Sequence, residues 1–277
     1  MLPITDDHMH INIHGGRGMD AIKEFKNAGG THVLIVSLPA GEIGMTIAKG
    51  DDFRAVFDAA VDAARQANEF VKAFAVVGVH PAEYVNLAES LGMERAYAIV
   101  KEGLEIAAKY VAEGKAIALK SGRPHYPVSP ELWETSNALM RYAMDLCVDE
   151  GCAIQLHTES EPGTMQSLSD IAKQARMEPQ KVIKHFSPPL VRECESLNVF
   201  PSVICSRGAL EEALSQGTRF MMETDYIDDP DRPGAVLGPK TVPRKTKEAI
   251  RNGVPEETFY KIHKDNPEKS YGIKIEL

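Results

Sequence analysis

Histidines and carboxylates stand together at the start of the chain, in the stretch DDHMH. His8 and His10 are two residues apart, directly behind Asp6 and Asp7. In a β-strand residues i and i+2 point to the same face, so the two imidazoles would aim at one point. Neutral imidazole and carboxylate are good ligands for divalent metal ions, so the stretch predicts part of a metal site. A solvated N-terminal tail is the alternative, because chain ends are often poorly ordered.

Several other short apolar stretches also end in a polar side chain. Five of the nine histidines fall at the ends of four such stretches, and a carboxylate ends another. A single histidine at such an end more often serves packing, whereas several from separate strands indicate a metal centre. No cysteine ends a stretch, which argues against a closed structural zinc site. The residues at these ends are His8 and His10, His80, Lys120, His157, His185 and Asp225.

Such a set of ligands with open coordination positions predicts hydrolytic chemistry. A bound divalent ion lowers the pKa of its water from about 15.7 to about 7, and two ions about 3.5–4 Å apart polarise the bond under attack. Asp225 is placed to ligate one ion and to take the proton from the attacking water. We expect two divalent metal ions. Zinc is the first candidate, and Mg, Mn, Ni and Fe are the alternatives.

The elements that must position these residues alternate along the chain. Short runs rich in β-branched residues alternate with longer amphipathic ones, which is typical of βα units around a parallel sheet. Eight repeats predict one α/β domain over residues 1–277, a (β/α)8 TIM barrel, whose active site lies at the carboxyl ends of the strands. An open doubly wound sheet is the alternative, but no G-x-G-x-x-G follows the first strand. The predicted strands are 4–10, 31–39, 73–80, 116–120, 153–157, 181–185, 199–204 and 219–225.

Composition narrows the class of protein further. A formal charge of −9 argues against broad electrostatic capture of nucleic acid. The four cysteines lack CxxC spacing, which indicates free thiols in a reducing cytosol. No apolar run approaches the roughly 18 residues that a membrane helix needs. We expect a cytoplasmic protein with no membrane contact, and the sequence leaves its oligomeric state open.

Six short motifs spread over the chain carry a resemblance to a known family. They are DDHMH, GVHP at 78–81, QLHTE at 155–159, KHFSP at 184–188, METDY at 222–226 and NPEKSYGI near the C-terminus. Together they resemble the TatD-related branch of the amidohydrolase superfamily of metal-dependent hydrolases. The resemblance implies a (β/α)8 barrel with a mono- or binuclear metal centre. It implies His8 and His10 as ligands of the more buried metal, His157 and His185 as ligands of the more exposed one, and Asp225 as ligand and general base.

Lys120 departs from the pattern of that family. TatD-type relatives usually carry a bridging glutamate at the end of strand four, in a segment like GEIG, whereas this chain reads LKSG. An ammonium cannot ligate a metal and would repel two nearby cations. We hypothesise that CO2 carboxylates Lys120 to a carbamate that bridges two metals, as in phosphotriesterase-like and dihydroorotase-like relatives. The alternative is an unmodified Lys120 whose charge replaces the second ion, leaving one metal or none.

Residues close to the strand ends are candidates for substrate binding. Arginines on a barrel rim suit anionic substrates such as phosphates, although each taken singly is more often a surface ion-pair partner. Glu223 should face the same side as Asp225, deeper in the barrel, and hydrogen-bond a ligand histidine. The proline-containing segment 226–245 is predicted to be an ordered loop or lid. The predicted substrate-binding residues are His80, Arg123, His125, Glu159 and Arg207.

Two classes of function compete for this sequence. The first is a metal-dependent hydrolase, for which the resemblance suggests DNase-like phosphodiester cleavage at nucleic-acid ends. Lys120 instead favours lactone, amide or phosphotriester hydrolysis of a small molecule. A nuclease needs a basic groove that bears aromatic residues, and a chain of charge −9 with one tryptophan shows none. The second class is a non-catalytic barrel that binds a metal or a metabolite.

Overall fold

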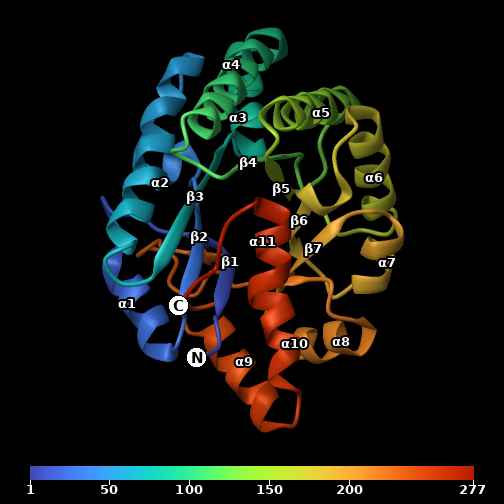
Figure 1. The fold of residues 1–277 in the computed structure, drawn as a ribbon. Coiled ribbons are helices and arrows are strands. Elements are labelled where there is room, and N and C mark those ends of the chain that lie inside the picture. The colour runs from blue at the N-terminus through green and yellow to red at the C-terminus, as the bar shows by residue number, and fades with distance from the viewer.

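The eight predicted strands are present in the computed structural model, which describes all 277 residues, and they form one parallel sheet. Strands that follow one another along the chain are neighbours in the sheet, and every pairing is parallel. Helices lie between the strands on the outside (Figure 1). The predicted (β/α)8 barrel is confirmed. The strands are β1 (Thr5–His10), β2 (His32–Val36), β3 (Lys72–Gly78), β4 (Ala118–Gly122), β5 (Ala153–His157), β6 (Val182–Ser187), β7 (Phe200–Ile204), β8 (Met221–Glu223) and β9 (Tyr226–Ile227).

The eighth strand is broken, and the break closes the barrel. Its first part, β8, pairs with β7, whereas its continuation, β9, pairs with β1. Asp225 lies between the two parts with φ 45°, in the left-handed region that non-glycine residues rarely adopt. The predicted strand 219–225 is therefore shorter than expected. The irregular backbone brings Asp225 to the mouth of the barrel, where its carboxylate joins the histidines of β1.

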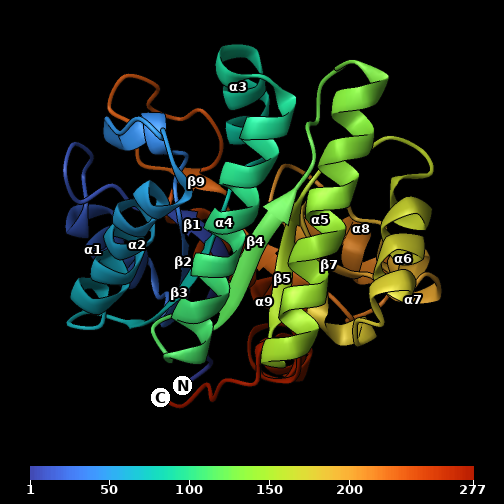
Figure 2. The same ribbon diagram turned by 90° about the horizontal axis from the view of Figure 1, so that it is seen from above.

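The helices lie on the outside of the strands (Figure 2), and the side chains that α2 and α4 bury are mostly apolar. α5 shows the expected end signals, because the Ser129 hydroxyl accepts the amide hydrogen of Leu132 and Gly151 ends the helix at φ 66°. None of the helices combines the length and the apolar character that crossing a membrane requires. The helices are α1 (Met19–Ala28), α2 (Phe53–Ala67), α3 (Pro81–Leu91), α4 (Met93–Ala112), α5 (Pro130–Glu150), α6 (Thr164–Ala175), α7 (Val191–Ser196), α8 (Ala209–Gln216), α9 (Thr241–Arg251), α10 (Glu256–Tyr260) and α11 (Asn266–Tyr271), with short helical turns η1 (Ala40–Ile43), η2 (Gly50–Asp52), η3 (Pro179–Lys181) and η4 (Lys261–Asp265).

The segment after the eighth strand is more regular than expected. The sequence predicted a loop over 226–245, but β9 occupies its first two residues and α9 begins at Thr241. The irregular part is therefore limited to 228–240. The loop between β1 and α1 holds this segment in place. The buried Asp228 carboxylate accepts hydrogen bonds from the backbone amides of Asn12, Arg17 and Gly18 in that loop.

The interior of the barrel is filled below the site. A layer of apolar side chains from β2 to β8 lies inside the sheet, and the ring of Tyr271 joins it from α11. The start of the barrel is covered by η4 and α11, where the Asn266 amide donates to the carbonyls of Thr218 and Phe220. Because this end is packed, only the end at which the strands finish is open to a ligand. The interior residues are Leu34, Val36, Val76, Ala118, Ala153, Ile183, Phe200, Met221 and Tyr271.

Candidate metal centre

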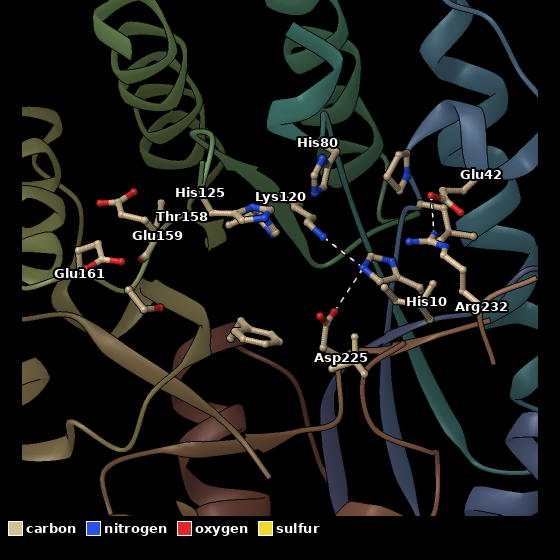
Figure 3. Close-up of a pocket in the computed structure, with 17 residues that line it drawn as sticks. His10, Glu42, His80, Lys120, His125, Thr158, Glu159, Glu161, Asp225 and Arg232 are labelled. Carbon is tan, nitrogen blue, oxygen red and sulfur yellow. Dashed lines mark hydrogen bonds and ion pairs between the residues drawn. The ribbon is translucent and has the colours of Figure 1, made fainter. Parts of the chain in front are cut away.

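The two histidines of β1 point at a lysine and an aspartate from other strands. The Nε2 atoms of His8 and His10 lie 3.1 Å apart, and both are buried. Lys120 Nζ lies 3.2 Å from His8 Nε2 and 3.3 Å from His10 Nε2. Asp225 Oδ1 lies 3.7 Å from each of the same two nitrogens. Figure 3 shows Lys120 and Asp225 both pointing toward His10.

The histidines of β5 and β6 extend this cluster. The ring of His185 stacks on that of His8, with ring centres 3.7 Å apart. His157 Nδ1 lies 3.3 Å from His185 Nε2. Ligand atoms of His8, His185 and Asp225 all lie within 4.8 Å of one another, a spacing that one metal ion can span. The structure therefore brings together all six residues predicted as metal ligands.

Each of the four histidines predicted as ligands has a partner on the ring nitrogen that faces away from the centre. For three of them the partner is an oxygen that can only accept, so the hydrogen stays on Nδ1 and the lone pair of Nε2 points to the centre. These contacts include the predicted one between Glu223 and a ligand histidine. The pairs are His8 Nδ1 with Gln155 Oε1 at 2.7 Å, His10 Nδ1 with the Val36 carbonyl at 2.9 Å, and His185 Nδ1 with Glu223 Oε1 at 2.9 Å.

In His157 the two ring nitrogens have exchanged roles, because Nδ1 and not Nε2 faces the centre. Its Nδ1 faces His185, and its Nε2 lies 2.8 Å from Nδ1 of His125. If His157 donates from Nε2 to Nδ1 of His125, its own Nδ1 lone pair is free to bind a metal. His80 lies beside the same ring at 4.5 Å between ring centres, and its own Nδ1 accepts from the Ala82 amide.

The protonation states favour metal binding. Burial lowers the pKa values of His8, His10, His157 and His185 well below the usual range, so these imidazoles are neutral and can lend a lone pair. Burial raises the pKa of Asp225 to about 6, against the opposing effect of Lys120.

Buried carboxyl groups beneath the histidines also fit a cation. Asp6 Oδ2, Asp7 Oδ1 and Glu223 Oε2 are buried without a hydrogen-bond partner. Burial raises the pKa values of all three carboxyl groups. A positive ion above them would favour their charged forms and lower these pKa values again. Neutral imidazoles, the Asp225 carboxylate and nearby buried carboxyl groups with unpaired oxygens together fit a divalent metal ion.

A buried lysine ties together the strands that carry His157 and His185. Lys184 Nζ donates to the carbonyl of Thr158 at 3.1 Å and to that of His185 at 2.7 Å. One ammonium thus joins the carboxyl ends of β5 and β6. The sequence alone does not predict this role, because an alternating strand pattern does not reveal what a buried lysine contacts.

The cluster forms the floor of a cavity of about 470 Å³. Of the predicted substrate-binding residues, His80, His125 and Glu159 line this cavity, whereas Arg123 and Arg207 do not. Further lining residues were not predicted, because their approach to the cavity depends on contacts between distant segments. These are Leu38, Pro39, Glu42, Thr158, Ser160, Glu161, Phe186, Ile227, Arg232 and Val236, and Figure 3 labels several of them.

Arg123 lies behind the cavity wall and not on the rim. Its guanidinium is 2% exposed and holds Glu159 through two hydrogen bonds of 2.9 and 2.5 Å. It also donates to Asn137 and Ser167 at 2.9 Å each, and it stacks on the Trp133 ring. The donors of a buried arginine need partners, and here Glu159, Asn137 on α5 and Ser167 on α6 provide them.

A (β/α)8 barrel that gathers imidazoles and a carboxylate at its strand ends has the architecture of a metal-dependent hydrolase. The comparison with known families agrees, because the model of the TatD-related DNase family matches residues 5–272. The chain therefore belongs to the TatD-related DNase family.

Individual relatives support the fold over the whole chain. The uncharacterized protein MJ1127 of Methanocaldococcus jannaschii is 41% identical over 281 residues, which is 100% of this chain and 98% of that protein. A mutant PTE-like lactonase from Deinococcus radiodurans matches 98% of this chain and 96% of its own, with TM-score 0.65 and 15% identity. The phosphotriesterase homology protein of Escherichia coli, solved with phosphate in its active site, matches 98% and 99%, with TM-score 0.65 and 11% identity. At these identities the two structures show likeness of fold alone.

Proposed function

We propose that this chain is a hydrolase that binds two divalent metal ions and cleaves phosphodiester bonds. Zinc is the first candidate for these ions. The observation that carries the proposal is the meeting of His8, His10, Lys120 and Asp225 at distances of 3.1–3.7 Å on the floor of the cavity. His8 and His10 would hold the more buried ion, and His157 and His185 the more exposed one. One ion with an unmodified Lys120 is the simpler variant of the same proposal.

Divalent ions bound there would supply Lewis acidity and a water of lowered pKa. The protein groups do the rest. Asp225 Oδ1 faces the Nε2 atoms of His8 and His10, so its carboxylate is placed to accept the proton of an attacking water. Gln155 and Glu223 keep the ligand imidazoles in the required tautomer. His80 and Glu159 line the cavity and would contact the substrate.

We propose that Lys120 is carboxylated and bridges the two ions. Its Nζ attacks CO2, a nitrogen–carbon bond forms, and one proton leaves to solvent. Burial lowers the pKa of Lys120 to about 8, which increases the fraction of free amine that this reaction needs. Protein loaded with metal in ¹³C-bicarbonate should give a carbamate signal that is absent in Lys120→Glu. Tight binding of two ions without such a signal would contradict the carbamate.

Two substrate classes follow from different observations. Membership of the TatD-related DNase family supports phosphodiester cleavage at nucleic-acid ends. Lys120 at the centre supports the second candidate, hydrolysis of lactones, amides or phosphotriesters. We further propose a cytoplasmic location, because all four cysteines are buried free thiols.

Metal analysis combined with activity tests this proposal. The purified protein should contain up to two equivalents of divalent metal and hydrolyse a phosphodiester only while the metal is present. Asp225→Asn should remove the hydrolysis and keep the fold. Metal-loaded protein that hydrolyses neither phosphodiesters nor lactones would contradict it and would favour a non-catalytic metal- or metabolite-binding barrel.

A further inference from the structure

Apolar side chains line the cavity in addition to the groups of the proposed metal centre. Phe186, Ile227, Val236, Leu38 and Pro39 all line it. Phe186 follows a ligand histidine at the end of β6, and 41% of it is exposed although it lies at the active-site cavity. An aromatic ring exposed inside a concave site is available to stack on a flat group of a ligand.

The position of Phe186 is held at a conformational cost. Its φ is 52°, which is unfavourable for a bulky residue. Its amide donates to the buried Glu223 Oε1 at 2.7 Å, and the same oxygen contacts His185 Nδ1 at 2.9 Å. One carboxylate therefore fixes both a ligand imidazole and the backbone that carries the exposed ring. Strain that the surroundings maintain in this way is typical of residues that serve a site.

The charges at the mouth are unsuited to a polyanion. Arg232 is the arginine of the cavity lining, and it is already paired with Glu42 at 2.7 Å and with Asp229 at 2.5 Å. Glu161 also lines the cavity and makes no ion pair with a lysine or arginine. Arg123, which the sequence suggested as a binding residue for anionic substrates, is paired with Glu159 behind the cavity wall. No unpaired arginine is left there to bind a second phosphate.

We infer that the cavity binds a flat, uncharged aromatic group against Phe186 while the reacting group sits at the metal centre. The substrate class is then a small ester or phosphodiester that carries one aromatic ring, up to the size of a nucleobase, and not a polynucleotide strand. The inference rests on the proposed function, because the metal ions must hold the reacting group. A volume of about 470 Å³ is within the usual range for a small-molecule site.

Binding of two matched phosphonates to the zinc-loaded protein tests the aromatic subsite. Phenylphosphonate and methylphosphonate carry the same anionic head for the metal ions and differ in the ring. Calorimetry should show phenylphosphonate binding about tenfold more tightly, which is the size expected for one stacking contact. In Phe186→Ala the two affinities should converge, and Phe186→Leu should retain part of the difference because it keeps apolar volume.

A matched control is Tyr260→Ala, which removes another exposed aromatic ring on α10, outside the cavity lining. It should leave the tenfold preference in place. If neither phosphonate binds to metal-loaded protein, the proposed metal centre fails. If both bind equally in the unmodified protein, the centre stands and the aromatic subsite is wrong.

A charge comparison tests the exclusion of polymers. Phenylphosphonate should bind more tightly than trithymidylate to the unmodified protein, and Glu161→Lys should shift this ratio toward trithymidylate severalfold. Trithymidylate binding more tightly than phenylphosphonate would overturn the inference and favour an enzyme of nucleic-acid ends.

Discussion

The two ends of the barrel bury histidines in opposite ways. At the end where the strands begin, both ring nitrogens of His263 are bonded within the protein, since Nδ1 accepts from the Thr5 amide and Nε2 pairs with the Thr246 hydroxyl. At the end where they finish, His8 and His10 each bond one nitrogen outward and turn the other toward a shared centre. A buried polar group with both sides satisfied is explained by the fold, whereas several imidazole nitrogens gathered around one point indicate a ligand site.

In the cavity wall, as at the end where the strands begin, the buried polar groups bond to one another. Arg123 and Glu159 saturate each other, and Thr164 donates to Glu159 at 2.8 Å. The floor differs, because Nε2 of His8 faces only other groups of the predicted centre, Nε2 of His10 and Nζ of Lys120. We therefore expect changes at the floor to affect chemistry and metal binding, and changes in the wall or at the packed end to affect stability.

Asp225→Asn should give the largest effect. The variant keeps the shape of the side chain but cannot take a proton, so kcat should fall by about 10²- to 10⁴-fold. The circular dichroism spectrum and the melting temperature should stay close to those of the unmodified protein. Activity within a few fold of normal would remove Asp225 from the role of general base.

Arg123→Met should lower stability and leave metal binding intact. The change leaves the largely buried Glu159 carboxylate without its cation, and breaking a buried pair on one side costs about 3–5 kcal/mol of unfolding free energy. Denaturant titration measures this. Arg141→Met is the control, because its pair with Asp145 is exposed and is worth at most about 1 kcal/mol. Equal effects of the two changes would contradict the contrast between wall and surface.

His125 lies between the cavity floor and the solvent: it is exposed, but its ring contacts His157, a predicted metal ligand. His125→Leu removes the acceptor on His157 Nε2, so affinity for the more weakly bound metal equivalent should fall about 10- to 100-fold. His125→Asn keeps an acceptor oxygen near the position of Nδ1 and should retain most of the affinity. Competition with a metal indicator measures both variants. A loss in the Asn variant as large as that in the Leu variant would mean that the contact does not fix His157.

The packed end predicts a pH effect on stability. Burial lowers the pKa of His263 to about 3, whereas the unfolded chain takes up this proton near pH 6.5. Between these values the unfolded state binds more protons, so the free energy of unfolding falls as the pH drops below about 6.5. The contribution between pH 7 and pH 5 is on the order of 2 kcal/mol. Urea titrations at both pH values should show a smaller drop for His263→Gln, and an unchanged drop would exclude His263 as its source.

The order of the elements was predictable because each βα unit is a local pattern. Alternation of apolar runs and amphipathic stretches identified all eight strand regions, and β5 matches its predicted range 153–157. The division of the last strand into β8 and β9 was not predictable, because the positive φ of Asp225 is imposed by closure against β1. The end of the segment 226–245 was missed for a related reason, since α9 begins where it packs against the barrel.

The candidate ligands could be read from the sequence because strand alternation and strand ends are local features. By themselves, the residue types and spacing determined the barrel, the six predicted ligands and the contact of Glu223 with a histidine. Only the tertiary structure decided that Gln155 and His125 support ligand histidines and that Arg123 turns away from the cavity. Those outcomes depend on contacts between distant segments, where burial forces each polar group to find a partner that no local pattern names.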